Sequence, residues 1–152
     1  MPAASEGTQP VPLPHTWRPL GVRLAATFFG LMLLTICAFA WFGFDESVRD
    51  RFSVFQRGTL LALGLMAFAC GHALARSRVQ ARPGSLLVVN GYRRREFEWP
   101  EVVAVHLPRG APWAVLDLAD GTSVPAMGIQ GSDGDRARLA MRQLRVLIDQ
   151  PH

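Results

Sequence analysis

Two long apolar runs, residues 24–44 and residues 58–75, constrain this chain more than any other feature. Neither run contains Asp, Glu, Lys or Arg. At about 1.5 Å of rise per residue they form helices of about 31 and 27 Å, long enough to cross a hydrocarbon core about 30 Å thick. A soluble fold would have to bury both helices on all sides, and the rest of a 152-residue chain is too small for that. We therefore predict a transmembrane hairpin.

The apolar runs divide the chain into three predicted parts. Residues 1–23 form a disordered or interfacial tail, because residues 1–14 are rich in small and polar residues without hydrophobic periodicity. Trp17, Arg18 and Arg23 then have the composition of an interfacial anchor before a span. Residues 24–75 form the two-helix hairpin, with spans 24–44 and 58–75, and residues 76–152 form a soluble domain.

The first apolar run also has some features of a secretory signal. Arginines precede it, and Ala38 and Ala40 form the small-x-small triplet of a cleavage site. The run is longer than the usual signal core and continues through Trp41 and Phe44, so an uncleaved span is the better interpretation. The sequence leaves open whether the run is ever cleaved.

The distribution of arginine predicts the orientation of the spans. The chain has a net charge of +4, which suits a position beside anionic lipid. Basic residues flank the pair of spans more heavily than they fill the connection between them, so the positive-inside rule places both termini in the cytoplasm, with the protein in the plasma membrane. The flanking arginines are Arg18, Arg23, Arg76, Arg78, Arg82, Arg93, Arg94 and Arg95, and those between the runs are Arg49, Arg51 and Arg57.

The soluble part has the pattern of a small α+β domain. Short strands are predicted at residues 79–82, 85–89, 92–99, 102–107, 113–118 and 122–127, with tight turns at Asn90-Gly91 and Asp120-Gly121. Alternation places Phe97 and Trp99 in a core, together with an inward set of Val103, Val105 and Leu107. Residues 136–148 have helical periodicity. We expect a bent antiparallel sheet or partly open barrel of six or seven strands, capped by one C-terminal helix.

Several stretches of this domain resemble a known family. They are residues 98–102 (EWPEV), 110–116 (GAPWAVL), 120–122 (DGT) and 125–131 (PAMGIQG). Together with the strand order and the terminal helix, they resemble the bacterial pleckstrin-homology (PH) family of low molecular weight protein antigen 6, which is found in actinobacteria. The resemblance covers residues 77–148, and the preceding hairpin matches the usual layout of that family. It implies a PH-like fold and membrane attachment, and no settled activity.

No stretch of the sequence predicts catalysis or a cofactor. There is no nucleophile with a base, no phosphate-binding glycine loop and no metal-ligand spacing. The cysteines, Cys37 and Cys70, lie inside the apolar runs and are not placed for a zinc site. We therefore expect a protein that is not an enzyme, with no metal, cofactor, nucleic-acid partner or small-molecule substrate.

Three groups of residues remain as candidate sites. An arginine cluster has the composition of an anionic-lipid contact, or of residues that only set the membrane orientation: Arg76, Arg78, Arg82, Arg93, Arg94 and Arg95. A stripe of small residues, Ala67, Gly71 and Ala75, would allow close helix packing, as would Ala26 and Gly30 in the first run. Trp113 either faces a protein partner or packs against the C-terminal helix.

These features predict a membrane-anchored, cytoplasm-facing module for interaction or scaffolding. Its partner would be a second copy of the chain or another membrane protein. Two alternatives remain: a membrane protein that senses anionic lipid, and an accessory subunit of a larger membrane complex.

Overall fold

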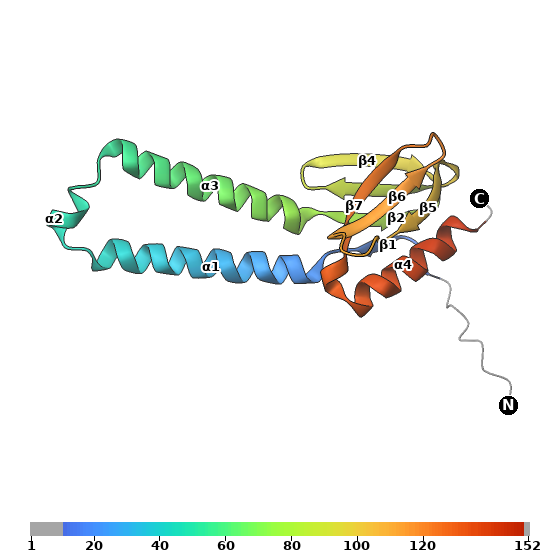
Figure 1. Cartoon of the computed structure of the whole chain (residues 1–152), viewed down its shortest axis with the longest axis horizontal. Coiled ribbons are helices and arrows are strands. Elements are labelled where there is room, and N and C mark those ends of the chain that lie inside the picture. Colours follow the sequence, from blue (N-terminus) through green and yellow to red (C-terminus); the bar gives the residue numbers. More distant parts are fainter. Residues whose placement is uncertain (1–10, 151–152) are drawn as a thin grey trace, which may run out of the picture. The chain divides into compact units, whose positions relative to one another are not determined.

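The computed structural model describes residues 11–150 and divides into two units (Figure 1). One unit is Leu20–Arg76. The other combines the described residues before Leu20 with those from Ser77 onward. The chain therefore leaves the soluble domain and returns to it, and the helical unit is an insertion in that domain.

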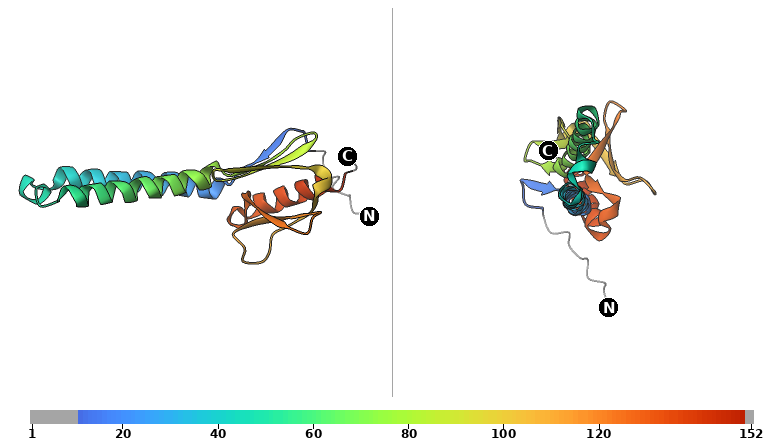
Figure 2. Two further views of the ribbon diagram at one scale, coloured as in Figure 1. Left: turned by 90° about the horizontal axis from the view of Figure 1, so that it is seen from above. Right: turned by 90° about the vertical axis from the view of Figure 1, so that its left-hand side faces the viewer.

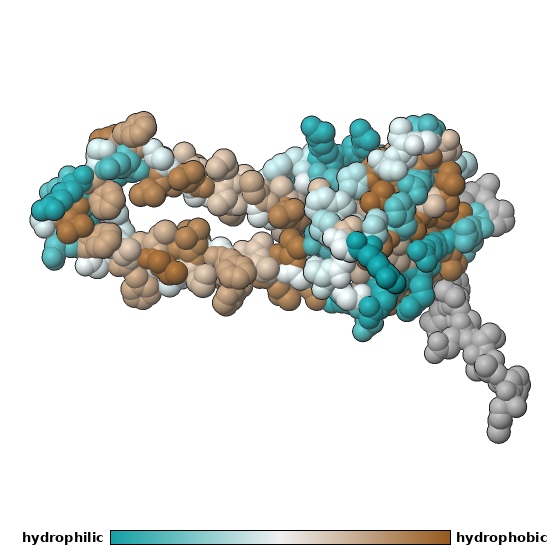
Figure 3. Space-filling model, in the orientation of Figure 1, coloured by the Kyte–Doolittle hydropathy of each residue, from teal (hydrophilic) through white to brown (hydrophobic). Residues whose placement is uncertain are grey.

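The helical unit contains two long helices and a short one. They are α1 (Leu20–Gly43), α2 (Glu46–Arg49) and α3 (Val54–Arg76). The long helices run side by side (Figures 1 and 2), and they begin four residues earlier than the predicted spans. Neither has a buried residue, and hydrophobic side chains cover their surface in Figure 3. Both are long and apolar enough to cross a membrane.

The connection between the long helices is held by specific contacts. The guanidinium of Arg57 lies 5.5 Å from the centre of the Trp41 ring and donates a hydrogen bond to the carbonyl oxygen of Arg49. Ser53 and Gln56 exchange side-chain and backbone hydrogen bonds across the first turn of α3, which is the reciprocal pattern of a capping box. The helix start at Val54 thus follows from a capping signal that lies outside the apolar run.

The soluble unit consists of two antiparallel sheets and one long helix. The four-stranded sheet has the order β1 (His15–Trp17), β2 (Arg78–Ala81), β3 (Ser85–Asn90) and β4 (Arg93–Glu98). The three-stranded sheet contains β5 (Val102–His106), β6 (Trp113–Leu118) and β7 (Ser123–Gln130). Short 3-10 helices, η1 (Trp99–Glu101) and η2 (Gly131–Asp133), precede β5 and the helix α4 (Asp135–Ile148). This confirms the predicted fold class.

Strand β1 corrects the predicted N-terminal tail. It pairs with β2 across the whole insertion, with Trp17 opposite Val79. The Trp17 side chain is only 7% exposed, and its Nε1 donates a 2.9 Å hydrogen bond to Oε1 of Gln143 on α4. Val11 is also buried in this core. Trp17 is therefore a core residue and not an interfacial anchor, and the part of the predicted tail before residue 11 lies outside the described residues.

Strand β5 also departs from the predicted alternation. A register irregularity between Val102 and Ala104 interrupts its pairing with β6. Val102 and Val105 are both buried, whereas Val103 is 59% exposed. The predicted inward position of Val103 is wrong because a bulge adds a residue and breaks the two-residue period. Phe97 and Trp99 lie in the core as predicted.

The two sheets meet where β7 crosses the start of β2. A Cβ atom built on Gly128 would lie 2.5 Å from the backbone nitrogen of Val79 and 2.6 Å from Cα of Arg78. No side chain fits at such a distance, so glycine is required for this close approach of two backbones. The side chain of Asn90 adds a second link, because its Oδ1 accepts a 3.0 Å hydrogen bond from the backbone N–H of Met127 on β7.

Candidate functional site

The predicted arginine cluster is divided between the two ends of the four-stranded sheet. The register aligns Arg78 on β2 with Val89 on β3 and Arg94 on β4. Arg93, Arg94 and Arg95 are exposed and begin β4, next to the turn that joins it to β3. This basic end is also where β1 ends and β2 begins. Both connections to the helical unit leave from it, and Arg76 is the last residue of α3.

Arg82 lies at the other end of β2, among acidic side chains. Its Nη1 is 2.9 Å from Oε1 of Glu96, which also accepts a 2.8 Å hydrogen bond from Oγ of Ser85. The Ser85 hydrogen bond is the largest cause that holds the pKa of Glu96 below its ordinary value of 4.5, and the positive charges of Arg82 and Arg94 also lower it. Arg82 thus shares the carboxylate of Glu96 with Arg94, whose Nη2 lies 3.5 Å from Oε2.

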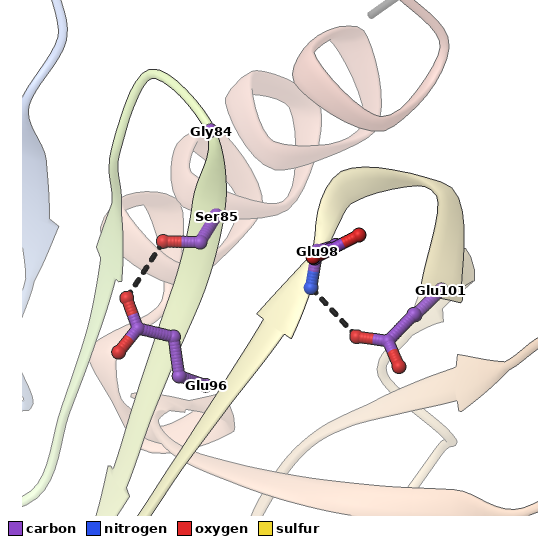
Figure 4. A pocket seen from close by; sticks show the side chains of 5 residues that line it. All are labelled: Gly84, Ser85, Glu96, Glu98 and Glu101. Atoms are coloured by element: carbon purple, nitrogen blue, oxygen red, sulfur yellow. Dashed lines mark hydrogen bonds between the residues drawn. The ribbon is translucent and has the colours of Figure 1, made fainter.

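An open hollow lies in the protein surface at this acidic end of the sheet. It is lined by Gly84, Ser85, Glu96, Glu98 and Glu101 (Figure 4). Within it the backbone N–H of Glu98 donates a 2.7 Å hydrogen bond to Oε2 of Glu101. Across the described residues, no group of three or more His, Cys, Asp or Glu side chains is arranged to hold a metal ion.

The sheet therefore has a basic end and an acidic end. Strand β4 runs from Arg93 to Glu98, and five steps of about 3.3 Å separate these residues by about 17 Å. That exceeds the Debye length of about 8 Å at physiological ionic strength, so the charges of Arg93 and Glu98 are largely screened from each other in water, whereas Glu96 between them contacts Arg94. An anionic ligand meets attraction at the end that carries the connections to the helices.

The outer face of the three-stranded sheet carries His106, Asp117 and Ser123 in contact. Nδ1 of His106 lies 3.0 Å from Oδ2 of Asp117, and Oγ of Ser123 donates a 2.8 Å hydrogen bond to Oδ1 of the same carboxylate. The carboxylate stands between the imidazole and the hydroxyl, so the imidazole does not accept the serine proton. This order differs from that of a hydrolytic triad, in which histidine contacts the nucleophile.

Trp113 is partly buried at the start of β6. Ala114 and Leu116 are fully buried, which places Val115 between them on the opposite, outer face. The pairing of β6 with β7 shifts register between Trp113 and Ala114. Both interpretations open from the sequence, contact with a protein partner and packing against α4, stay predictions.

The small-residue stripe lies along α3 and partly faces α1. A Cβ atom built on Gly71 would be 3.9 Å from Cβ of Ala26, which is ordinary van der Waals contact. Gly71 and Ala75 are half-buried, whereas Ala67 is exposed. At Gly71, therefore, the small residue serves the packing of the two helices within one chain.

Sequence reasoning misassigned two residues of the four-stranded sheet. The first is Trp17, which was predicted as an interfacial anchor because a strand of three residues gives too short a pattern to predict. The second is Tyr92, which was assigned to a strand but lies in the turn between β3 and β4. Asn90 on β3 pairs with Arg93 on β4, so the two central residues of the turn are Gly91, with φ of +60°, and Tyr92. The turn therefore begins one residue later than the predicted Asn90-Gly91.

Comparison with known proteins identifies the domain. Residues 76–146 match the family model described as a bacterial PH domain. Uncharacterized protein Rv1417 of Mycobacterium tuberculosis is 34% identical over 151 residues, which cover 97% of this chain and 94% of the relative. The chain belongs to the bacterial PH-domain family. Uncharacterized protein Mb1452 of Mycobacterium bovis matches with the same identity and coverage, and no solved structure gives a significant match.

The family match and the structure differ at the N-terminal side of the bacterial PH domain. The matched residues begin at the end of α3 and leave out β1. The similarity to the mycobacterial relatives spans nearly the whole chain, and therefore includes both β1 and the helical insertion. A bacterial PH domain with two apolar helices is suited to act as a membrane-associated module.

Proposed function

We propose that this protein is a two-span plasma-membrane protein that holds its PH domain on the cytoplasmic side as an interaction or scaffold module. The main observation that supports this topology is the pairing of β1 with β2, which lie on either side of the helical insertion in the sequence. Two strands of one sheet lie on one side of a membrane, so the chain between them crosses an even number of times. The two long apolar helices supply those two crossings.

The same pairing supports an uncleaved first helix. Cleavage after Ala40 would separate β1, and with it the buried side chains of Val11 and Trp17, from the rest of the domain.

The arginines on both flanks of the insertion lie on the same side of the membrane in this topology, because both flanks belong to one domain. The positive-inside rule then compares their sum with Arg49, Arg51 and Arg57 of the connection and favours the cytoplasm.

Cysteine accessibility tests this topology in the full-length protein. We would replace Cys37 and Cys70 by alanine and introduce one cysteine at a time, by Thr16→Cys, Ser47→Cys or Gly84→Cys. In intact cells, a membrane-impermeant maleimide should label only the Ser47 site, and permeabilisation should expose the other two. Labelling of the Thr16 and Gly84 sites on opposite sides would refute the proposal.

The interaction role requires a separate experiment. The full-length protein would be purified in mild detergent, and the mass of the complex measured. A stoichiometric second protein or second copy that is lost on Trp113→Ala, and kept on Val103→Ala, supports the scaffold role. Val103 is a matched control because it is 59% exposed on β5 of the same sheet. A monomer without protein partners would overturn this role.

We also propose that the protein is not an enzyme and that it takes no cofactor, nucleic acid or small-molecule substrate.

The basic end of the sheet favours one second function, which is binding of anionic lipid. Each arginine near an anionic surface contributes about 1 kcal/mol, or about fivefold in affinity. Replacing Arg93 and Arg94 by serine should therefore reduce the anionic lipid that co-purifies, whereas replacing Arg136 and Arg142 on α4 should not. If replacing either pair reduced the co-purified lipid equally, the lipid would respond to net charge alone.

We also propose, from the sequence motifs, that the domain is of the low molecular weight protein antigen 6 type.

A further inference from the structure

The turn between β3 and β4 presents an aromatic side chain at the basic end of the domain. Among the described residues of the soluble unit, three large apolar side chains are exposed, and Tyr92 is the aromatic one. It is 61% exposed at the second central position of the turn. Gly91 occupies the first central position with φ of +60°, which is the place that a type II′ hairpin turn gives to glycine. Arg93 and Arg94 follow directly.

Hydrogen bonds to two other segments hold this turn in place. The backbone N–H of Gly91 donates a 2.9 Å hydrogen bond to Oγ of Ser77, whose side chain is fully buried. On the other side, the amide of Asn90 bonds to the backbone of β7 at Pro125 and Met127. The turn is therefore pre-organised, and Tyr92 is presented outward without a further cost of ordering the backbone.

The hydrogen bond to Ser77 also fixes where the turn lies along the chain. Ser77 directly follows Arg76, the last residue of α3. The turn is thus hydrogen-bonded to the residue that directly follows the second apolar helix in the chain. Tyrosine is enriched where membrane and water meet, because its ring is apolar and its hydroxyl is polar. Arginines beside an interfacial tyrosine can reach headgroup phosphates with their charged ends. Of the two arginines here, Arg94 also lies 3.5 Å from Oε2 of Glu96.

We propose that residues 91–94 form an interfacial anchor of the PH domain, in which Tyr92 enters the headgroup layer of the lipid bilayer and Arg93 and Arg94 contact lipid phosphates. This inference rests on the proposed two-span topology. It goes beyond that topology because a tethered domain need not touch the bilayer. The anchor holds the domain against the membrane surface in one orientation, with the acidic hollow at the end of the sheet away from the anchor.

Fluorescence quenching by lipid-bound nitroxides tests the anchor in the full-length protein. Single cysteines, introduced by Tyr92→Cys or by Gly84→Cys in a chain with Cys37→Ala and Cys70→Ala, would carry an environment-sensitive fluorophore in vesicles of phosphatidylcholine and phosphatidylglycerol. Gly84 is the matched control because it lies in the turn between β2 and β3, at the opposite end of the same sheet. A Cβ atom there meets nothing within 4 Å.

The expected result is a blue shift and quenching by headgroup nitroxides at the Tyr92 site, with neither change at the Gly84 site. Equal, water-like spectra at both sites would overturn the anchor. A label on native Cys70, in a chain with Cys37→Ala, separates this failure from failure of the topology. Cys70 lies within α3, and quenching by acyl-chain nitroxides there shows that α3 is in the bilayer. No quenching at Cys70 would overturn the topology and the anchor together.

Discussion

Replacement of Trp17 by alanine should strongly destabilise the PH domain, although Trp17 precedes the helical insertion and the rest of the domain follows it. The side chain is 7% exposed. An aromatic residue of this size buries about 200 Å², which at about 25 cal/mol per Å² gives an upper estimate of about 5 kcal/mol. Measured losses for tryptophan to alanine in protein cores are about 3–5 kcal/mol. We expect a loss of about 4 kcal/mol in the free energy of unfolding.

The hydrogen bond from Trp17 to Gln143 allows the packing and polar contributions to be separated. Trp17→Phe keeps most of the apolar contact and removes the donor, so it should cost less than Trp17→Ala, with about 1 kcal/mol from the lost hydrogen bond. Trp41→Ala is the control, because Trp41 lies on α1 outside the domain and is 40% exposed.

The assay is a urea titration of the full-length protein in lipid nanodiscs, read by a short protease pulse that cuts only the unfolded domain. Each variant would be compared with the wild-type chain at the same temperature and lipid composition. If Trp17→Ala shifts the free energy by less than about 1 kcal/mol, as expected for exposed sites, the domain does not depend on β1 and the argument for an even number of crossings is lost.

Three further predictions follow from single positions. Gly128→Ala should lower the free energy of unfolding by about 2–3 kcal/mol, because the new Cβ would collide with the backbone of β2, whereas Gly84→Ala should be nearly neutral in the same titration. The lowered pKa of Glu96 predicts a contribution to stability that is present above pH 4.5 and disappears as the pH falls through the lower folded value; Glu96→Gln should flatten this part of the stability profile. Gly71→Ile should separate the two long helices, detected as reduced cross-linking between them, and Gly64→Ile, with no neighbour within 4 Å, should not.

Much of the secondary structure could be predicted from local sequence. The apolar runs determine two long helices, since their composition fits few other environments. The strands after the insertion follow from alternation, and Pro83-Gly84 and Asp120-Gly121 mark turns where the structure has them. Helix α4 follows from a stripe that buries Ala137, Met141 and Leu144. These features depend on the period of neighbouring residues, which the sequence contains directly.

The candidate site was predictable only as a list of residues. Six arginines were grouped because they are near one another in sequence. The register of the sheet separates Arg82 from the arginines at the start of β4 by nearly the length of a strand. The carboxylate of Glu96 then contacts both Arg82, at 2.9 Å, and Arg94, at 3.5 Å, so it links arginines from the two ends of the sheet. Strand pairing is a long-range property, and no local window of sequence reports it.

The sequence by itself determined that this protein has two membrane-length apolar helices, an arginine-rich flank on each side of them and a small α+β domain. Only the tertiary structure decided that the domain begins before the helices. Strand β1 has three residues and little pattern of its own, so its stability comes from β2 and α4 through the backbone pairing and the burial of Trp17. Contacts between residues separated by a whole helical hairpin form only in the folded chain, and they make the hairpin an insertion in a PH domain.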